Sequence, residues 1–145
     1  MPVHYKIFPA FNVVVSKPLG KVTETCVLGY FHQVHDDPDY KPGLDHLIDN
    51  SGVKELDLDY AQMRNICAHE MRTIRTAPRR VTTVQIVQDD SWFGMARMYQ
   101  QISETDDEQD VFIATTIKDA AAHLGLGPDA VAVIEAFCDG GFCTT

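Results

Sequence analysis

Apolar and polar residues follow two different periods along this chain, and together they predict strands alternating with helices. Two β-rich segments come first, at residues 4–8 and 11–17, with only Pro9-Ala10 between them. A connection this short favours an antiparallel hairpin. The second segment is broken by Pro18-Leu19-Gly20, after which Thr23 is well placed to cap a helix.

Two helices and a strand are predicted over the next 55 residues. Val27, Phe31 and Val34 recur at helical spacing until Asp36-Asp37-Pro38 ends the pattern. Residues 44–49 then predict a short third strand. A second helical pattern runs over residues 60–74, with either Asp57 or Asp59 as its N-cap.

The most regular β–α unit lies between residues 81 and 102. Residues 81–87 predict a buried strand, Asp89-Asp90-Ser91 supply helix caps, and residues 92–102 predict a helix. An acidic segment at 104–110 separates this unit from a last strand at 111–115 and a helix at 117–124.

The resulting order is β-β-α-β-α-β-α-β-α. Strands that alternate with helices imply parallel pairing through right-handed crossovers, and the initial hairpin makes the sheet mixed. We therefore predict a single-domain α/β fold with a mixed, mostly parallel β-sheet. Residues 1–125 form this domain, and 126–145 form a C-terminal extension with a short helix at 130–137 and a flexible tail.

The two faces of the predicted sheet differ in polarity. In the fourth strand Thr82, Val84 and Ile86 share one face, whereas Thr83 and Gln85 lie on the other. Fully sandwiched parallel strands are usually apolar on both faces. We therefore expect the helices to pack mainly on one face, with the other covered by the C-terminal segment, a second subunit or a ligand.

Composition excludes several classes of partner. The 145-residue chain has a net charge of −9, which argues against a nucleic-acid binder because phosphate contacts require clustered cations. No apolar run approaches 18 residues, so we expect no membrane-spanning helix. The first residues lack the features of a signal peptide, and a cytoplasmic location is the expectation. No cofactor motif is present, and no cofactor is predicted.

Three segments together resemble a known family. They are residues 37–45, with the sequence Asp-Pro-Asp-Tyr-Lys-Pro-Gly-Leu-Asp; the strand ending at 47–49; and residues 79–98, which include Phe-Gly-Met-Ala-Arg-Met. Over about residues 3–125 the chain resembles the small bacterial SpoIIAA-like proteins, also called STAS/SEC14-domain proteins. The resemblance implies a mixed sheet with helices packed against it. Related folds include phosphorylated anti-sigma-factor antagonists and lipid-carrying domains.

The same resemblance indicates a modification site. Asp49-Asn50-Ser51-Gly52 is similar to the Asp-Ser-Ser-Gly motif of the anti-sigma antagonists, which places Ser51 at the phosphorylated serine. Phosphate at an exposed turn would repel or recruit a partner. The alternative is that Asn-Ser-Gly simply forms a turn.

Arginines are concentrated in one part of the chain. Five of them fall in the second helix and the strand entry after it: Arg64, Arg72, Arg75, Arg79 and Arg80. Such a patch could receive a phosphate, a phospholipid head group or an acidic partner surface. The alternative is a solvated face whose cations favour the helix C-terminus.

Two other groups carry metal-ligand or thiol chemistry. His32 and His35 lie three residues apart beside Asp36 and Asp37, a spacing that would let both imidazoles reach one metal ion or simply mark an exposed helix end. Cys138 and the cysteine at 143 flank two glycines, and could close a small disulfide, bind a soft metal or belong to a disordered tail.

The leading functional hypothesis is a non-enzymatic binding or regulatory module of the STAS/SEC14 type. It would act on a protein partner, most simply as a homodimer, or on a lipid or other apolar ligand. The rival hypothesis is a small enzyme using carboxylates at strand ends, Asp49, Asp89 and Asp90, with His46. An enzyme requires these groups to converge in one pocket, whereas a binding module requires an apolar cavity or patch.

Overall fold

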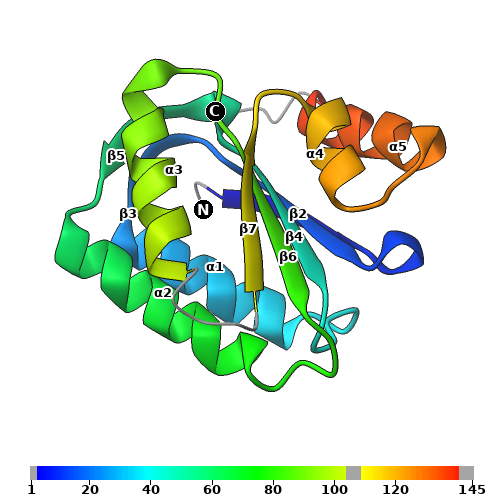
Figure 1. The fold of residues 1–145 in the computed structure, drawn as a ribbon, viewed down its shortest axis with the longest axis horizontal. Helices are drawn as coiled ribbons and strands as arrows, with labels where there is room; N and C mark the ends of the chain where they lie inside the picture. The colour runs from blue at the N-terminus through cyan, green and yellow to red at the C-terminus, as the bar shows by residue number, and fades with distance from the viewer. Residues whose placement is uncertain (1–2, 104–108, 141–145) are drawn as a thin grey trace.

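A computed structural model describes residues 3–103 and 109–140 and shows a five-stranded sheet in the order β1-β2-β4-β6-β7 (Figure 1). β1 pairs antiparallel with β2, and the other neighbours are parallel. The mixed, mostly parallel α/β architecture predicted from the sequence is therefore confirmed. The strands are β1 Val3–Phe8, β2 Val13–Pro18, β4 Asp45–Asp49, β6 Val81–Ile86 and β7 Gln109–Ala114.

The helices form where the periodicity predicted them, and side chains cap three of their N-termini. The Thr23 hydroxyl accepts from the Cys26 amide, and Thr116 caps α4 in the same way. Asp59, not Asp57, is the N-cap of α2, where it forms a capping box with Gln62. The helices are α1 Glu24–Asp36, α2 Tyr60–Ile74, α3 Asp90–Ser103, α4 Ile117–His123 and α5 Pro128–Cys138.

A second, two-stranded parallel sheet was not predicted. It pairs β3, Gly20–Thr23, with β5, Val53–Asp57, along the edge of α1 and α3 (Figure 1). Both strands are short, and no residue of β5 is buried. The local sequence of these strands therefore does not predict them. Each strand is stabilised by its partner, which lies about thirty residues away in the chain.

Helices cover both faces of the main sheet, so the prediction that they pack mainly on one face is wrong. α4 and α5 lie on one face and α1, α2 and α3 on the other (Figure 1). The core under α4 and α5 contains the more apolar strand positions together with Ala120 of α4 and Ile134 of α5: Val13, Val15, Leu47, Val84 and Ile86.

The C-terminal segment was one of the expected covers of the polar face, and it does not lie there. α5 closes the apolar face, where Ile134 is fully buried. Lys17 of β2 also donates to the carbonyl oxygen of Cys138 at 2.6 Å, which anchors the last turn of α5. The predicted tail beyond residue 140 lies outside the described residues.

Within residues 3–103 and 109–140, none of the helices has the length and apolar character required to cross a bilayer.

A candidate ligand cavity on the polar face of the sheet

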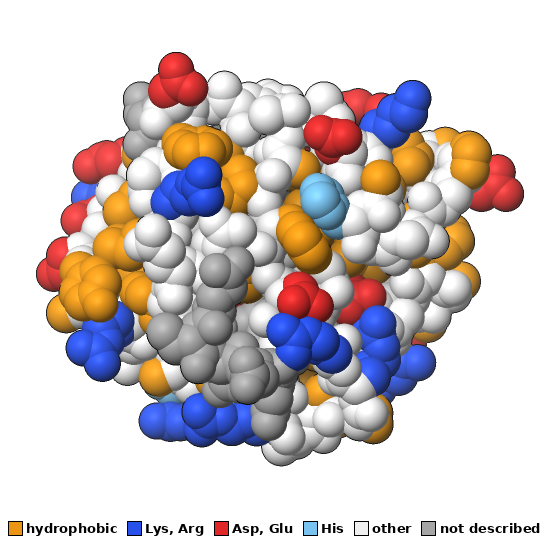
Figure 2. Space-filling model, viewed as in Figure 1, with side chains coloured by type: hydrophobic (Ala, Val, Ile, Leu, Met, Phe, Trp, Pro, Cys, Tyr) orange, Lys and Arg blue, Asp and Glu red, His pale blue; other side chains and the backbone are white. Residues whose placement is uncertain are grey.

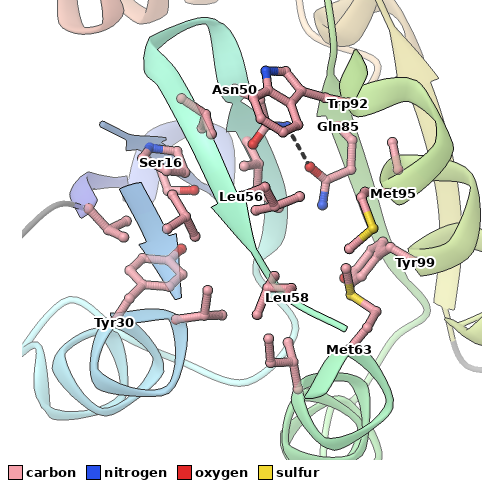
Figure 3. Close-up of a pocket in the computed structure, with 18 of the residues that line it drawn as sticks. Ser16, Tyr30, Asn50, Leu56, Leu58, Met63, Gln85, Trp92, Met95 and Tyr99 are labelled. Atoms are coloured by element: carbon pink, nitrogen blue, oxygen red, sulfur yellow. Dashed lines mark hydrogen bonds between the residues drawn. The ribbon is translucent and has the colours of Figure 1, made fainter. Parts of the chain in front are cut away.

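A cavity of about 120 Å³ lies between the polar face of the main sheet, the small β3–β5 sheet and helices α1 to α3 (Figure 3). For comparison, a dry apolar cavity of about 150 Å³ engineered in another protein takes up benzene. The cavity therefore has room for a group on the order of one six-membered ring.

The floor of the cavity is a row of side chains across three strands. Ser16 of β2 is paired in register with Ile48 of β4, and Ile48 with Gln85 of β6. Ile48 and Gln85 remain only half-buried although they lie in the central strands of the sheet. Helices thus surround this part of the face without filling the space directly above it.

The walls are almost entirely apolar. α1 contributes Val27 and Phe31, and α2 contributes Met63 and Ile66. The outer side is formed by half-exposed residues of β5 and α3 and the loop after β5: Leu56, Leu58, Trp92 and Met95 (Figure 3). Trp92 is the only tryptophan of the chain, so the tryptophan fluorescence of the protein comes from a residue that lines this cavity.

Most polar groups at the cavity are paired with one another. The Asn50 amide donates to Gln85 Oε1 at 2.8 Å beside Trp92 (Figure 3). Burial raises the pKa of Tyr30, although a hydrogen bond with Ser16 acts in the opposite direction. Tyr30 is therefore a neutral phenol at physiological pH.

Among the described residues, Glu70 of α2 is the one carboxylate that lines the cavity. It is 7% exposed, and its Oε1 accepts from the Tyr99 hydroxyl and, at 3.2 Å, from Gln109 Nε2. Gln109 also contacts Thr83 Oγ1 at 2.5 Å, so the network connects α2 and α3 to the sheet. Burial first, and then the charge of Glu70, raises the pKa of Tyr99 well above its usual value.

The sequence held a signal for Glu70 that our reading of the helical pattern missed. Met63, Cys67, Glu70 and Ile74 follow the helical repeat, so the glutamate occupies a position in the buried stripe of α2. A charged residue at such a position must be paired, neutralised or functional, because burial of an isolated charge is costly.

A second cavity, of about 340 Å³, lies between α1 and α2 and shares Tyr30, Phe31 and Glu70 with the first. Four of the six histidines line it: His32, His35, His46 and His69. Burial lowers the pKa of His46, whereas the nearby charges of Glu70 and Asp45 act to raise it.

The histidine pair at the end of α1 has ordinary partners. His35 Nε2 lies 3.1 Å from the Thr73 hydroxyl, and its ring packs at a 33° tilt against Tyr40 with a centroid separation of 4.5 Å. In the part of the chain that the structure describes, no cluster of three or more metal-binding side chains is close enough to hold an ion.

Arg79 and Arg80 are engaged with acidic residues of the sheet. Arg79 donates to the buried Asp45 at 2.8 Å and to the carbonyl oxygen of Gly43 at 2.9 Å. Arg80 makes two 2.8 Å hydrogen bonds to Asp110, whose pKa this pairing lowers. Both arginines therefore link the start of β6 to a neighbouring strand, Arg79 to β4 and Arg80 to β7, which is a structural role.

The other three arginines of the predicted patch lie on α2 or at its end. Arg64 stacks over Tyr60 at 5.9 Å, Arg72 lines the second cavity, and Arg75 is the exposed C-cap. Basic side chains gather in the part of Figure 2 where Figure 1 places α2. The prediction of an anion or partner patch therefore depends on these three residues.

Ser51 is exposed in a single 3₁₀ turn between β4 and β5. Its amide donates to Asp49 Oδ1 at 3.0 Å, and Asp49 also lies 3.8 Å from Lys17 Nζ. The preceding residue, Asn50, lines the first cavity. The candidate phosphorylation site is thus one residue away from the candidate ligand site.

The carboxylates of the enzyme hypothesis do not meet in either cavity. Asp49 is buried beside Lys17, whereas Asp89 and Asp90 are exposed at the start of α3. Among the described residues that line the two cavities, His46 is the only member of this set, and it lies in the second.

Cys138 is buried against Asp49, and burial raises the pKa of its thiol to about 12. A thiol with such a pKa is a poor nucleophile at neutral pH. Its proposed partner at position 143 lies outside the described residues.

Comparisons with protein-family models, with curated proteins and with solved structures find no match to this chain. The class of this protein is therefore given by its fold, a mixed α/β domain with a small accessory sheet. Its candidate ligand has to be inferred from the residues that line the cavity.

Proposed function

We propose that this protein is a non-enzymatic binding module that holds a small apolar ligand in the cavity above Ser16, Ile48 and Gln85. The single observation that carries the proposal is the half-burial of Ile48 and Gln85 in the two central strands. Central strand positions are normally covered by close-packed side chains. Here apolar side chains surround a space instead of filling it.

The energetics of an empty cavity support the same proposal. At roughly 24 cal/mol per Å³, an enclosed void of about 120 Å³ would cost on the order of 3 kcal/mol compared with a filled core, which is an upper limit here because the cavity is partly open to solvent. A ligand that fills the space restores the lost contacts. Apolar walls with a few fixed polar groups are also the usual composition of small-molecule sites.

We further propose that the module is related to the SpoIIAA-like, STAS/SEC14-domain proteins. The order of the initial hairpin and the following parallel strands is compatible with that relationship. A switch at Ser51 fits the same scheme, because a phosphate there would stand next to Asn50 at the cavity.

Binding of a protein partner, including a second copy of the chain, is supported less directly. The strongly exposed large apolar side chains among the described residues are Tyr60, Phe93 and Val133, which lie on three different helices. An arginine guanidinium lies over one face of each of the Tyr60 and Phe93 rings. The α2 arginines would instead suit an acidic partner surface.

The proposal can be tested with the fluorescence of Trp92. We expect bromobenzene, a one-ring probe whose heavy atom quenches indole, to reduce this fluorescence along a saturable curve. Ala96→Leu adds three carbons to the cavity wall and should abolish the saturable phase. Ala122→Leu is the matched control, because Ala122 is exposed on α4 at the opposite face.

The outcome that contradicts the proposal is equally clear. Quenching that rises linearly with bromobenzene, and is the same in the wild type and both variants, would mean that Trp92 meets the probe only by collision in solvent.

A further inference from the structure

Glu70 places a carboxyl group, a hydrogen-bond acceptor, in a cavity whose walls are mostly apolar. Its backbone belongs to the central part of α2, and the residue is more than nine-tenths buried. Tyr99 and Gln109 both donate to Oε1, which fixes the orientation of the carboxyl group. Because both neighbours are donors, the group acts as an acceptor.

The second oxygen of Glu70 has no such partner. Within the described residues, Oε2 accepts no hydrogen bond from a side chain or the backbone, although a carboxylate has about four acceptor positions. Glu70 is also one of only three described residues that line both cavities. Among the described residues, Oε2 is not one of the fully buried side-chain atoms without a partner, so it is open to a cavity, where a bound molecule can donate to it.

We propose that the ligand of this cavity is a small apolar molecule of about one ring that carries a hydrogen-bond donor, and that this donor binds Glu70 Oε2. The inference rests on the proposed function, since it names the chemical class of the same ligand. Hydroxyl and amine groups meet the requirement. A carboxylate head group offers no donor to Glu70 and would bring a second negative charge beside it, so we expect it to be rejected.

The other polar groups at the cavity explain why Glu70 selects the ligand. Gln85 Oε1 already accepts from the Asn50 amide, and Tyr30 is a neutral phenol that can itself donate. Glu70 Oε2 is therefore the acceptor that gains a bond on binding, and a site built to bond a hydroxyl discriminates strongly against an analogue that lacks it.

The test compares phenol with toluene, which have the same number of non-hydrogen atoms and differ in one donor. Each compound displaces bromobenzene from the wild-type protein, and recovery of Trp92 fluorescence, excited where phenol does not absorb, gives its affinity. We expect phenol to bind about tenfold to a hundredfold more tightly than toluene, the range for hydrogen bonds to charged groups. Benzoate should not compete.

Glu70→Gln supplies the matched variant. It keeps the shape of the side chain and an oxygen for Tyr99, but removes the charge, and we expect the phenol-to-toluene ratio to fall at least fivefold. Glu135→Gln, on the exposed side of α5, makes the same change outside the site and should leave the ratio unchanged.

Each outcome decides one of the two proposals. Equal affinities of phenol and toluene for the wild type, or a ratio unaltered by Glu70→Gln, would overturn the donor inference while leaving the apolar cavity intact. Failure of bromobenzene itself to bind saturably would overturn the proposed function. If Glu70→Gln does not fold, the wild-type ratio and the rejection of benzoate decide the inference.

Discussion

Replacing Ala96 with leucine should make the protein more stable while removing its ability to bind an apolar ligand. Ala96 is 7% exposed on α3, and its methyl group lines the cavity above the polar face of the sheet. In a close-packed core the same change would force neighbouring side chains apart. Here the added carbons have a space to enter.

The magnitude follows from the structure. Three added carbons at about 0.8 kcal/mol each would contribute at most about 2.4 kcal/mol, and fixing the leucine rotamer costs about 0.5–1 kcal/mol. The net gain is therefore about 1.5–2 kcal/mol. This remains below the approximately 3 kcal/mol assigned to the whole cavity of about 120 Å³.

Urea unfolding followed by far-ultraviolet circular dichroism measures this gain without relying on Trp92. The midpoint should rise at an unchanged slope, and the melting temperature should rise by about 3–8 °C for a chain of this size. Bromobenzene should raise the melting temperature of the wild type by mass action and leave that of the variant unchanged. Ala122→Leu should alter neither quantity appreciably.

A loss of more than about 1 kcal/mol in Ala96→Leu would refute this reasoning, because it would indicate overpacking. A variant that gained stability but kept the full ligand-induced shift would refute the location of the site. The first result would mean that the cavity has no room for the added carbons, and the second would mean that the ligand binds elsewhere.

Two further results are expected from groups outside the cavity wall. Arg79→Ala should lower the free energy of unfolding by about 1–3 kcal/mol, because it leaves the buried Asp45 without its charged partner. Arg80→Ala should lower it by less than about 1 kcal/mol, because its ion pair with Asp110 is exposed. Equal losses in chemical unfolding would contradict this ranking. Burial holds the pKa of His46 below its unfolded value of about 6.5, so the unfolded state binds more protons and stability should fall as the pH decreases through 6.5. Between pH 7.5 and pH 5.5 the melting temperature should decrease less in His46→Gln than in the wild type. The exposed control His32→Gln should behave as the wild type does. An identical decrease in all three proteins would be evidence against His46 as the source of the pH dependence.

Periodicity was sufficient to predict the helices and main strands of this fold, but not the small sheet or the presence of helices on both faces. The helices and main strands have their own apolar pattern, which depends on neighbours three or four residues away, or two in a strand. β3 and β5 have no such pattern, because their stability comes from pairing with each other and from α1. Interactions of this kind are invisible to a local reading.

The polarity of one sheet face was predicted correctly, but its cause was not. Thr83 and Gln85 were seen as polar positions that needed a cover outside the helices. In the structure Thr83 bonds to Gln109 and, through it, joins the Glu70 network, while Gln85 faces the cavity. Only the three-dimensional arrangement reveals that one polar residue is paired within the protein and the other borders an open space.

The candidate site residues named from sequence had a mixed outcome for a similar reason. Charge clustering located Arg79 and Arg80, but not the acids at 45 and 110 that pair with them. Whether Ser51 is phosphorylated stays a prediction, now with an exposed side chain next to the cavity. Spacing along the chain identifies reactive groups, whereas their partners depend on the crossing of distant elements.

The position of α5 has a consequence for synthesis of the chain on the ribosome. Val13 and Val15 share a core cluster with Ile134 and Cys138, which are synthesised roughly 120 residues later. Until α5 emerges, the apolar face of the sheet lacks its final helix and presents these valines to other nascent chains and to chaperones. Productive folding of this face is therefore completed only after α5 leaves the exit tunnel.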